Sequence, residues 1–429
     1  MSGLAFTLLA RLPDGSPAPD HPWQRWDTSS PLLAVGRDSS PVLKRYPGTR
    51  RYFAPQVERV LFPPAPAASE DRGRWVRQPI AESLGLELEG AGRSILAIDL
   101  LEVVRVALRP GVTFGIVHLS AVKADELDEV LLATALMATR YRREQEISSF
   151  TLMRGGERAQ LSGNEPVRSL VVELFGAAHP ELIHRLHIVV AARLPDEIAE
   201  DDEAIFRRAV GRGSSMDDAR EALLEKPERD AARTQQIGAA TVTFFGRSIS
   251  VTHREKPDPW LYNVRSYWSE ATLFALIQQS YLEIYAEQLG RLGGEPLAQP
   301  VDELFVQWLA FRNVLWWREL SYTTDVPGRI VERVHHELNT PRLFQELERA
   351  FATYVEARRH QSADSERVAL RGLQVYGASF AVVSAAAAVL QVLGENYLAS
   401  NRLLVVLSLL ALGAVAVFAT RWLLGRRDR

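Results

Sequence analysis

The sequence contains no cysteine. This absence excludes disulfide frameworks, Cys-ligated zinc, iron–sulfur clusters and thiolate nucleophiles. Net charge is also low, because 50 Lys and Arg nearly balance 53 Asp and Glu to leave a formal charge of −3. A nucleic-acid-binding domain is strongly basic, so we expect no nucleic-acid partner. A chain of 429 residues has room for about two or three domains.

The motifs of common enzyme classes are missing as well. The chain has no Walker A motif, no Gly-x-Ser-x-Gly elbow and no His-Glu-x-x-His pair. His335 and His336 are adjacent, and neighbouring helical side chains point about 100° apart, so we do not expect them to share a metal. We therefore predict that the protein is not an enzyme and holds no resident cofactor.

Two further polar features have structural as well as functional interpretations. His184 and His187 adjoin an expected strand without an identifiable carboxylate partner, and we interpret them as structural. The most acidic run is Glu200-Asp201-Asp202-Glu203. Four adjacent acids can bind a divalent cation, but such a run is more often a solvated loop or the start of a helix.

Near the C-terminus lie two uncharged apolar runs, residues 373–393 and 403–420. About 20 apolar residues at about 1.5 Å each cross a hydrocarbon core of about 30 Å. The alternative is a pair of buried helices in a soluble bundle. Residues 394–402 are too few for a domain, so the two runs would form a hairpin with both ends on the same side.

The arginines around the hairpin predict its orientation. They flank the outer ends of the two runs at Arg367, Arg371, Arg421, Arg426, Arg427 and Arg429. Clustered arginines mark the cytoplasmic side of a membrane. The first residues also lack the basic region and cleavage site of a secretory signal. We expect a multi-pass protein of the inner (plasma) membrane, with the lipid bilayer as a partner and both termini in the cytoplasm.

The first apolar run carries a face of small and polar residues in steps of three and four: Gln374, Gly377, Ala381, Ser384, Ala388 and Gln391. Residues at this spacing share one side of a helix. Small residues allow tight helix packing in membranes, which is one interpretation. The other is a water-facing pore lining, because polar groups that face lipid are costly. We favour the pore.

The segment after this face is Gly394-Glu395-Asn396-Tyr397. In this position it resembles the Gly-Met-Asn signature, usually followed by an aromatic residue, of the CorA-type magnesium transporter family. The resemblance covers about residues 260–429 and has Glu395 in place of Met. It implies a homo-oligomer, a pentamer if family-like, with the signature at the outer mouth of the pore. A ring of carboxylates would still attract cations, but magnesium selectivity does not follow from it.

Two functions follow as hypotheses. The first is a CorA-like oligomeric channel or transporter for divalent cations, gated by its cytoplasmic domain, with Mg²⁺ or another divalent cation as the transported or regulatory ion. The metal ligands of such a site are unknown. The alternative is a membrane-anchored ligand sensor or effector without metal-ion transport, in which the hairpin is an anchor or a stress-induced pore.

The expected fold is an α/β or α+β cytoplasmic domain, a long helical stalk and a transmembrane hairpin. We place these parts at residues 1–260, 261–371 and 372–424, with a basic tail at 425–429. Hydrophobic pattern and turn signals predict strands at 94–100, 112–119, 186–191, 241–245 and 248–252. They predict helices at 124–143, 267–289, 302–320 and 329–338, and a stalk helix that begins near Pro341. Prolines in residues 1–75 indicate an irregular segment with short strands and loops.

Overall fold

A computed structural model describes part of the chain. The described residues are 4–13, 24–25, 53–61, 73–77, 85–88, 94–106, 108–121, 150–154, 157–161, 166–176, 184–194, 199–212, 216–225, 233–237, 240–246, 248–253, 268–292, 299–316, 320–321, 325–356 and 358. The helix expected at 124–143 and the segment from 359 onward lie outside them. The chain divides into two compact units, residues 1–347 and residues 348–429.

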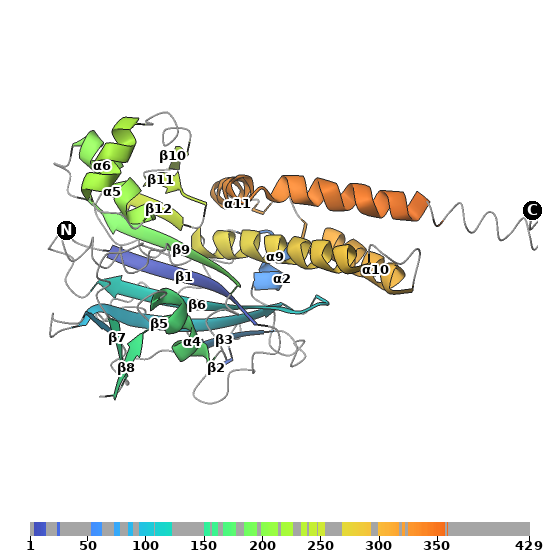
Figure 1. The fold of residues 1–429 in the computed structure, drawn as a ribbon, viewed down its shortest axis with the longest axis horizontal. Coiled ribbons are helices and arrows are strands. Elements are labelled where there is room, and N and C mark those ends of the chain that lie inside the picture. Colours follow the sequence, from blue (N-terminus) through green and yellow to red (C-terminus); the bar gives the residue numbers. More distant parts are fainter. Residues whose placement is uncertain are drawn as a thin grey trace, which may run out of the picture. The chain divides into compact units, whose positions relative to one another are not determined.

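The first unit is organised by a 12-stranded mixed sheet (Figure 1). Its main path runs in the order β10-β11-β12-β9-β1-β6-β5-β4-β7-β8, and β3 joins β2 to β5. Among the described pairings, β12 with β9 is parallel and the others are antiparallel. The strands are β1 Leu4–Leu12, β2 Gln24–Arg25, β3 Gly73–Arg77, β4 Gly85–Leu88, β5 Ser94–Val106, β6 Val112–Ala121, β7 Phe150–Arg154, β8 Glu157–Leu161, β9 His184–Arg193, β10 Thr234–Ile237, β11 Ala240–Phe244 and β12 Ser248–His253.

Strand β1 corrects the expectation of an irregular N-terminus. It is nine residues long and pairs with β6 on one side and β9 on the other, within the interior of the sheet. Its sequence LAFTLLARL is apolar almost throughout, because residues on both faces of the strand are buried. A strand buried on both faces loses the alternation that identifies half-exposed strands. The prediction of short strands and loops therefore did not anticipate a strand of nine residues in the interior of the sheet.

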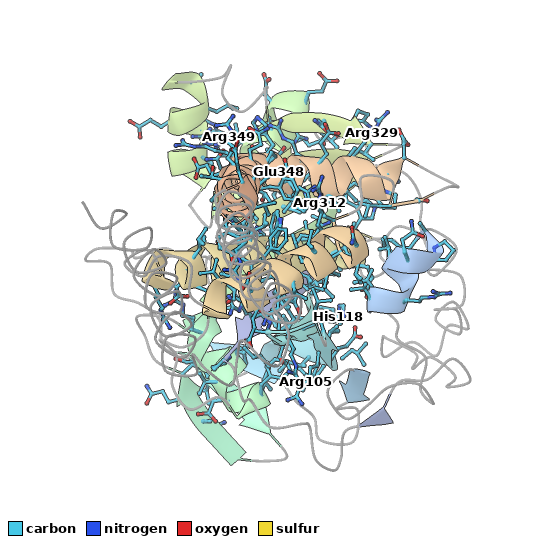
Figure 2. The ribbon with its side chains drawn as sticks, turned by 90° about the vertical axis from the view of Figure 1, so that its right-hand side faces the viewer. Arg105, His118, Arg312, Arg329, Glu348 and Arg349 are labelled. Carbon is cyan, nitrogen blue, oxygen red and sulfur yellow. The ribbon has the colours of Figure 1, made fainter. Side chains whose placement is uncertain are left out.

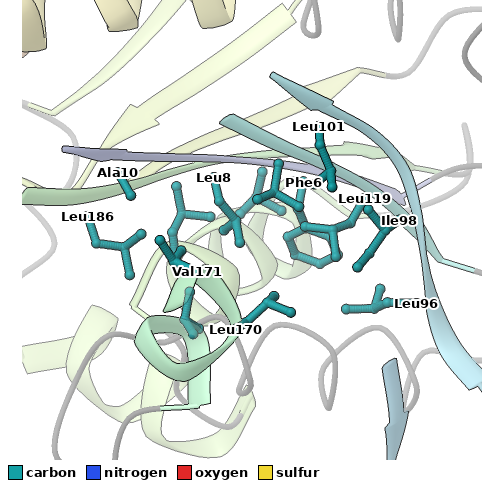
Figure 3. Packing of buried hydrophobic residues seen from close by; sticks show 14 of the residues in the cluster. Phe6, Leu8, Ala10, Leu96, Ile98, Leu101, Leu119, Leu170, Val171 and Leu186 are labelled. Atoms are coloured by element: carbon teal, nitrogen blue, oxygen red, sulfur yellow. The ribbon is translucent and has the colours of Figure 1, made fainter. Parts of the chain in front are cut away.

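One face of the sheet packs into the main hydrophobic core (Figure 3). Alternate residues of β1, Phe6, Leu8 and Ala10, meet Leu170 and Val171 of α4 (Pro166–Phe175) in this cluster. Phe206 of α5 (Glu200–Arg212) joins the same cluster. Because successive strand residues point to opposite faces, the residues between them, such as Thr7, belong to the other face.

Three helices follow the sheet within the first unit: α9 (Ser269–Leu292), α10 (Gln299–Val314) and α11 (Val326–Glu337). Helices α9 and α10 lie side by side, and α9 also contacts α11 and β6 (Figure 1). The Tyr281 hydroxyl of α9 donates hydrogen bonds to the carbonyls of Val106 (3.3 Å) and Leu108 (2.8 Å) at the end of β5. These hydrogen bonds connect α9 to the β5–β6 connection.

The helices expected at 267–289 and 329–338 are confirmed as α9 and α11. Helix α10 ends at Val314, before the expected 320. The amides of Leu315 and Trp316 both bond the carbonyl of Phe311, which closes the last turn. The carbonyl of Leu315 then accepts a 2.6 Å hydrogen bond from the Gln278 side chain. A side chain from another helix thus takes the place of the next helical turn.

Residues 340–356 are helical, which confirms a helix that begins near Pro341. The Leu343 amide bonds the carbonyl of Asn339 (3.3 Å), so Asn339 is the N-cap residue of this helix. Leu347 of this helix is buried, whereas Glu346, Arg349 and Glu356 are exposed. None of the helices in the described part of the chain combines the length and hydropathy required to span a membrane.

A glycine marks a close approach between β6 and α4. A Cβ at Gly115 would meet the Phe175 ring at 2.8 Å. We expect Gly115→Ala to lower the free energy of unfolding by about 1–3 kcal/mol, because the ring must move within a packed core. At Gly111 the nearest atom to an added Cβ is 3.8 Å away, so Gly111→Ala is the matched control and should change stability by less than about 0.5 kcal/mol. Urea unfolding of both variants tests this prediction, and equal losses in the free energy of unfolding would contradict it.

Candidate functional site

The predicted pore and mouth residues all lie outside the described residues. They are Gln374, Gly377, Ala381, Ser384, Ala388, Gln391, Gly394, Glu395, Asn396 and Tyr397. The same holds for the two apolar runs that would carry them. Their role as a pore lining stays a prediction. Within the part that is described, the candidate sites are clusters of buried polar side chains on the sheet and on the helices that follow it.

A row of three buried polar side chains crosses three neighbouring strands. Thr7 on β1, His118 on β6 and Glu102 on β5 are 1%, 2% and 0% exposed. The Thr7 hydroxyl lies 3.2 Å from His118 Nδ1, and His118 Nε2 lies 2.7 Å from Glu102 Oε1. Figure 2 labels His118 among the strands of the sheet. We call Thr7, His118 and Glu102 the polar row.

Strand register brings the polar row together. Thr7 lies directly opposite His118 in the antiparallel β1–β6 ladder. On the other side, His118 faces Leu100 of β5, and Glu102 is two residues farther along the same strand face. A register shift between Ile98 and Leu100 sets which β5 side chains share the face of His118. Opposite and diagonal neighbours on one sheet face lie within reach of one another's side chains.

The order of donors and acceptors in the polar row follows from its chemistry. An ionised Glu102 can only accept, so His118 Nε2 carries the proton that it donates. In a neutral imidazole Nδ1 is then an acceptor, and the Thr7 hydroxyl donates to it. Hydroxyl, imidazole and carboxylate in this order match a nucleophile–base–acid triad. Thr7 is 1% exposed, however, and a nucleophile must meet its substrate, so we interpret the polar row as a structural network.

The sequence contained a signal for the polar row that our interpretation of the chain missed. His118 interrupts the apolar run VTFGIVHLSA, and Glu102 interrupts ILAIDLLEVVRV. Lone ionisable residues in strands that are predicted to be buried are expected to be paired with one another.

His187, interpreted as structural, is 2% exposed on β9.

A second cluster joins α10, α11 and the helix that begins at residue 340. The Trp316 ring stacks on His335 of α11 with centroids 5.4 Å apart and planes 9° from parallel. Trp316 also stacks on Phe344 at 4.1 Å and 5°. We call Trp316, His335 and Phe344 the ring stack. It connects a residue just beyond α10 to both helices that follow.

Burial lowers the pKa of His335 to about 4, against a smaller opposing effect of its hydrogen bond with the backbone of Ala275. His336, the next residue, is exposed. The two adjacent histidines thus face different surroundings, as their 100° separation on a helix requires. Within the described ranges, no group of three or more His, Asp and Glu side chains is arranged to hold a metal ion.

The acidic run at Glu200 forms the first turn of α5. Glu200, Asp201 and Asp202 are exposed, whereas Glu203 is buried and accepts a 2.7 Å hydrogen bond from Thr252 of β12. Arg207 pairs with Glu203 one turn later. This placement agrees with the start of a helix, where acids are favourable.

Ion pairs connect α11 to the edge of the sheet. Glu337 of α11 lies 3.4 Å from Arg233, which precedes β10, and 3.3 Å from Arg333 of its own helix. The Arg333 guanidinium lies over the Phe244 ring of β11 at 5.9 Å. The Glu337 carboxylate is 7% exposed, so these pairs are better shielded from solvent than ordinary surface pairs.

A scan against protein-family models, a search of the curated proteins and a search of the solved structures found no match to this chain.

Proposed function

We propose that this chain is a membrane-anchored sensor or effector, in which the sheet unit acts on a two-helix membrane hairpin. The hairpin would be formed by residues 373–393 and 403–420, at the inner (plasma) membrane with both termini in the cytoplasm. One observation carries the proposal. Helix α11 is connected to the sheet edge through Glu337 and Arg233, and only two residues, Leu338 and Asn339, separate it from the helix that precedes the apolar runs.

Through this connection, a structural change in the sheet unit can pass along α11 to the helix that begins at residue 340. A ligand that shifts the β10–β11 edge moves Arg233 and Phe244, the two residues through which α11 contacts this edge. A displacement of α11 reaches residue 340 without a flexible loop, because the Asn339 carbonyl already accepts the first bond of the next helix. Rigid elements with two alternative packings carry coupling of this kind between distant sites.

The test uses the full chain in lipid nanodiscs with a single cysteine at Ser384→Cys, since the protein has no cysteine of its own. The protein should stay in the membrane fraction after carbonate extraction. Glu337→Gln removes the ionic connection, and we expect it to change the rate of maleimide labelling at position 384 by about 5-fold or more.

The matched control is Glu346→Gln, which breaks an exposed pair with Arg342 and should leave the labelling rate unchanged. Equal rates in the parent, Glu337→Gln and Glu346→Gln proteins would reject coupling through α11. Release of the full chain by carbonate would reject the membrane anchor.

Conduction of a divalent cation is the second candidate, favoured by the small and polar face of the first apolar run and by its resemblance to the CorA-type family. It requires several copies of the chain, with Ser384 and Gln391 around a common axis. Disulfide formation between protomers through Ser384→Cys, together with Mg²⁺ flux into liposomes, would support it. Intact oligomers without flux would leave the sensor or effector as the function.

A further inference from the structure

The chain turns a sharp corner between α11 and the helix that begins at residue 340. The Asn339 amide bonds the carbonyl of His336 (3.2 Å), which ends α11, and its own carbonyl accepts the first bond of the next helix. Asn339 has φ of 58°, a left-handed conformation that asparagine tolerates better than most residues. With only Leu338 and Asn339 as the joint between the two helices, side-chain packing must hold the angle.

The ring stack provides that packing. His335 lies before the joint and Phe344 lies after it, and both stack on Trp316. Trp308 of α10 adds a second contact to Phe344 at 5.2 Å. Stacked rings at these distances attract one another beyond the area that they bury. Opening of the corner would therefore separate at least one of the rings from Trp316.

We propose that the ring stack holds the corner between α11 and the helix that begins at residue 340 closed, and that acid opens this corner. His335 is its sensor, because it is 9% exposed and holds the backbone of Ala275 through one ring nitrogen. Within the described residues, its Nε2 has no hydrogen-bond partner. An imidazolium formed there would place a positive charge and an unsatisfied donor inside a ring cluster.

The elements packed around His335 supply no charge to balance it in the described part of the chain. The neighbours of Ala275 on the same face of α9 are Ala271, Thr272, Gln278 and Gln279, and the acids of α9, Glu270 and Glu283, are more than one turn from Ala275. The helix that begins at residue 340 contributes Thr340, Phe344 and Leu347. On α10, Arg312 lies one turn before Trp316 and is exposed. On α11 itself, Glu332 is exposed, and Arg333 and Glu337 pair with each other.

The direction of the effect follows from proton linkage. The pKa of His335 is about 4 in the closed corner and would return to about 6.5 in water, so the open corner binds more protons below pH 6.5. Opening is therefore favoured as the pH falls from about 6.5 towards 4. At pH 5 the ratio of open to closed corners should be about 30-fold higher than at neutral pH.

The experiment measures the corner itself, so its result does not depend on the proposed membrane function. Spin labels on Arg329→Cys and Gln345→Cys, both exposed, report the distance across the joint in the full chain. At pH 5.0 we expect a new distance population that is about 30-fold larger, relative to the closed one, than at pH 7.5. His335→Phe keeps a ring without a titrating proton and should abolish the response, and the adjacent control His336→Phe should preserve it.

Should His335→Phe fail to fold, His335→Gln provides the same test with a neutral side chain. An unchanged distance distribution between pH 7.5 and 5.0 would overturn the proposal. A pH response that persists in either His335 variant would overturn it as well, because the proton would then act elsewhere.

Discussion

Replacement of Glu102 by leucine should lower the free energy of unfolding by about 1–3 kcal/mol, the cost of leaving a buried hydrogen-bond donor without its acceptor. The substitution leaves His118 Nε2 without the carboxylate that lies 2.7 Å away in a site where both side chains are almost fully buried. Chemical unfolding of the full chain, followed by far-UV circular dichroism, measures the loss.

The informative control removes the whole polar row. Thr7→Val, His118→Leu and Glu102→Leu together replace the network by apolar side chains, and such replacement can be nearly neutral. We therefore expect the triple variant to be more stable than Glu102→Leu alone. The exposed acid Glu173 gives a baseline, because Glu173→Leu should change stability by less than about 0.5 kcal/mol. A triple variant less stable than Glu102→Leu would contradict the interpretation of the polar row as a network.

Trp308→Ala should have a larger effect, with a loss of about 3–5 kcal/mol in the free energy of unfolding. Trp308 is 2% exposed and meets Tyr285 edge-on at 5.9 Å, Phe311 at 5.6 Å and Phe344 at 5.2 Å. The same enclosure raises the pKa of Tyr285 by burial. Truncation of the indole leaves a cavity among rings that cannot easily collapse into it.

Val306 is the matched control for Trp308 because it lies on the same helix with 64% of its side chain exposed. Val306→Ala should change the free energy of unfolding by less than about 0.5 kcal/mol. Thermal and urea unfolding of both variants distinguish the two positions. Comparable losses would mean that α10 does not pack through its aromatic side.

Elements with a local signal could be predicted from the sequence. Strand β9 and the β11–β12 hairpin were expected at nearly their observed positions, and Gly246, with φ of 70°, lies in the turn between β11 and β12. Helices α5 and α6 (Met216–Glu225) lie in the charged stretch of the chain between β9 and β10. Turn chemistry and apolar spacing act over a few residues, so a single sequence reveals them.

Features that depend on distant partners could not be predicted in this way. Helix α9 was expected from its hydrophobic pattern, but the pattern did not indicate that it is buried continuously from residue 269 to 282, including Gln278 and Ser280. Its neighbours α10, α11 and β6 are the cause, and they come from separate parts of the chain. The end of α10 was missed for the same reason, since the Gln278 side chain takes the Leu315 carbonyl.

The sequence by itself determined the absence of cysteine chemistry, the near-neutral charge, the two uncharged runs and the start of the helix near Pro341. Only the tertiary structure decided that Thr7, His118 and Glu102 form one row and that His335 stacks on Trp316. The physical reason is register. Thr7 and His118 are 111 residues apart, and a shift of one residue in strand pairing would turn either side chain to the opposite face of the sheet.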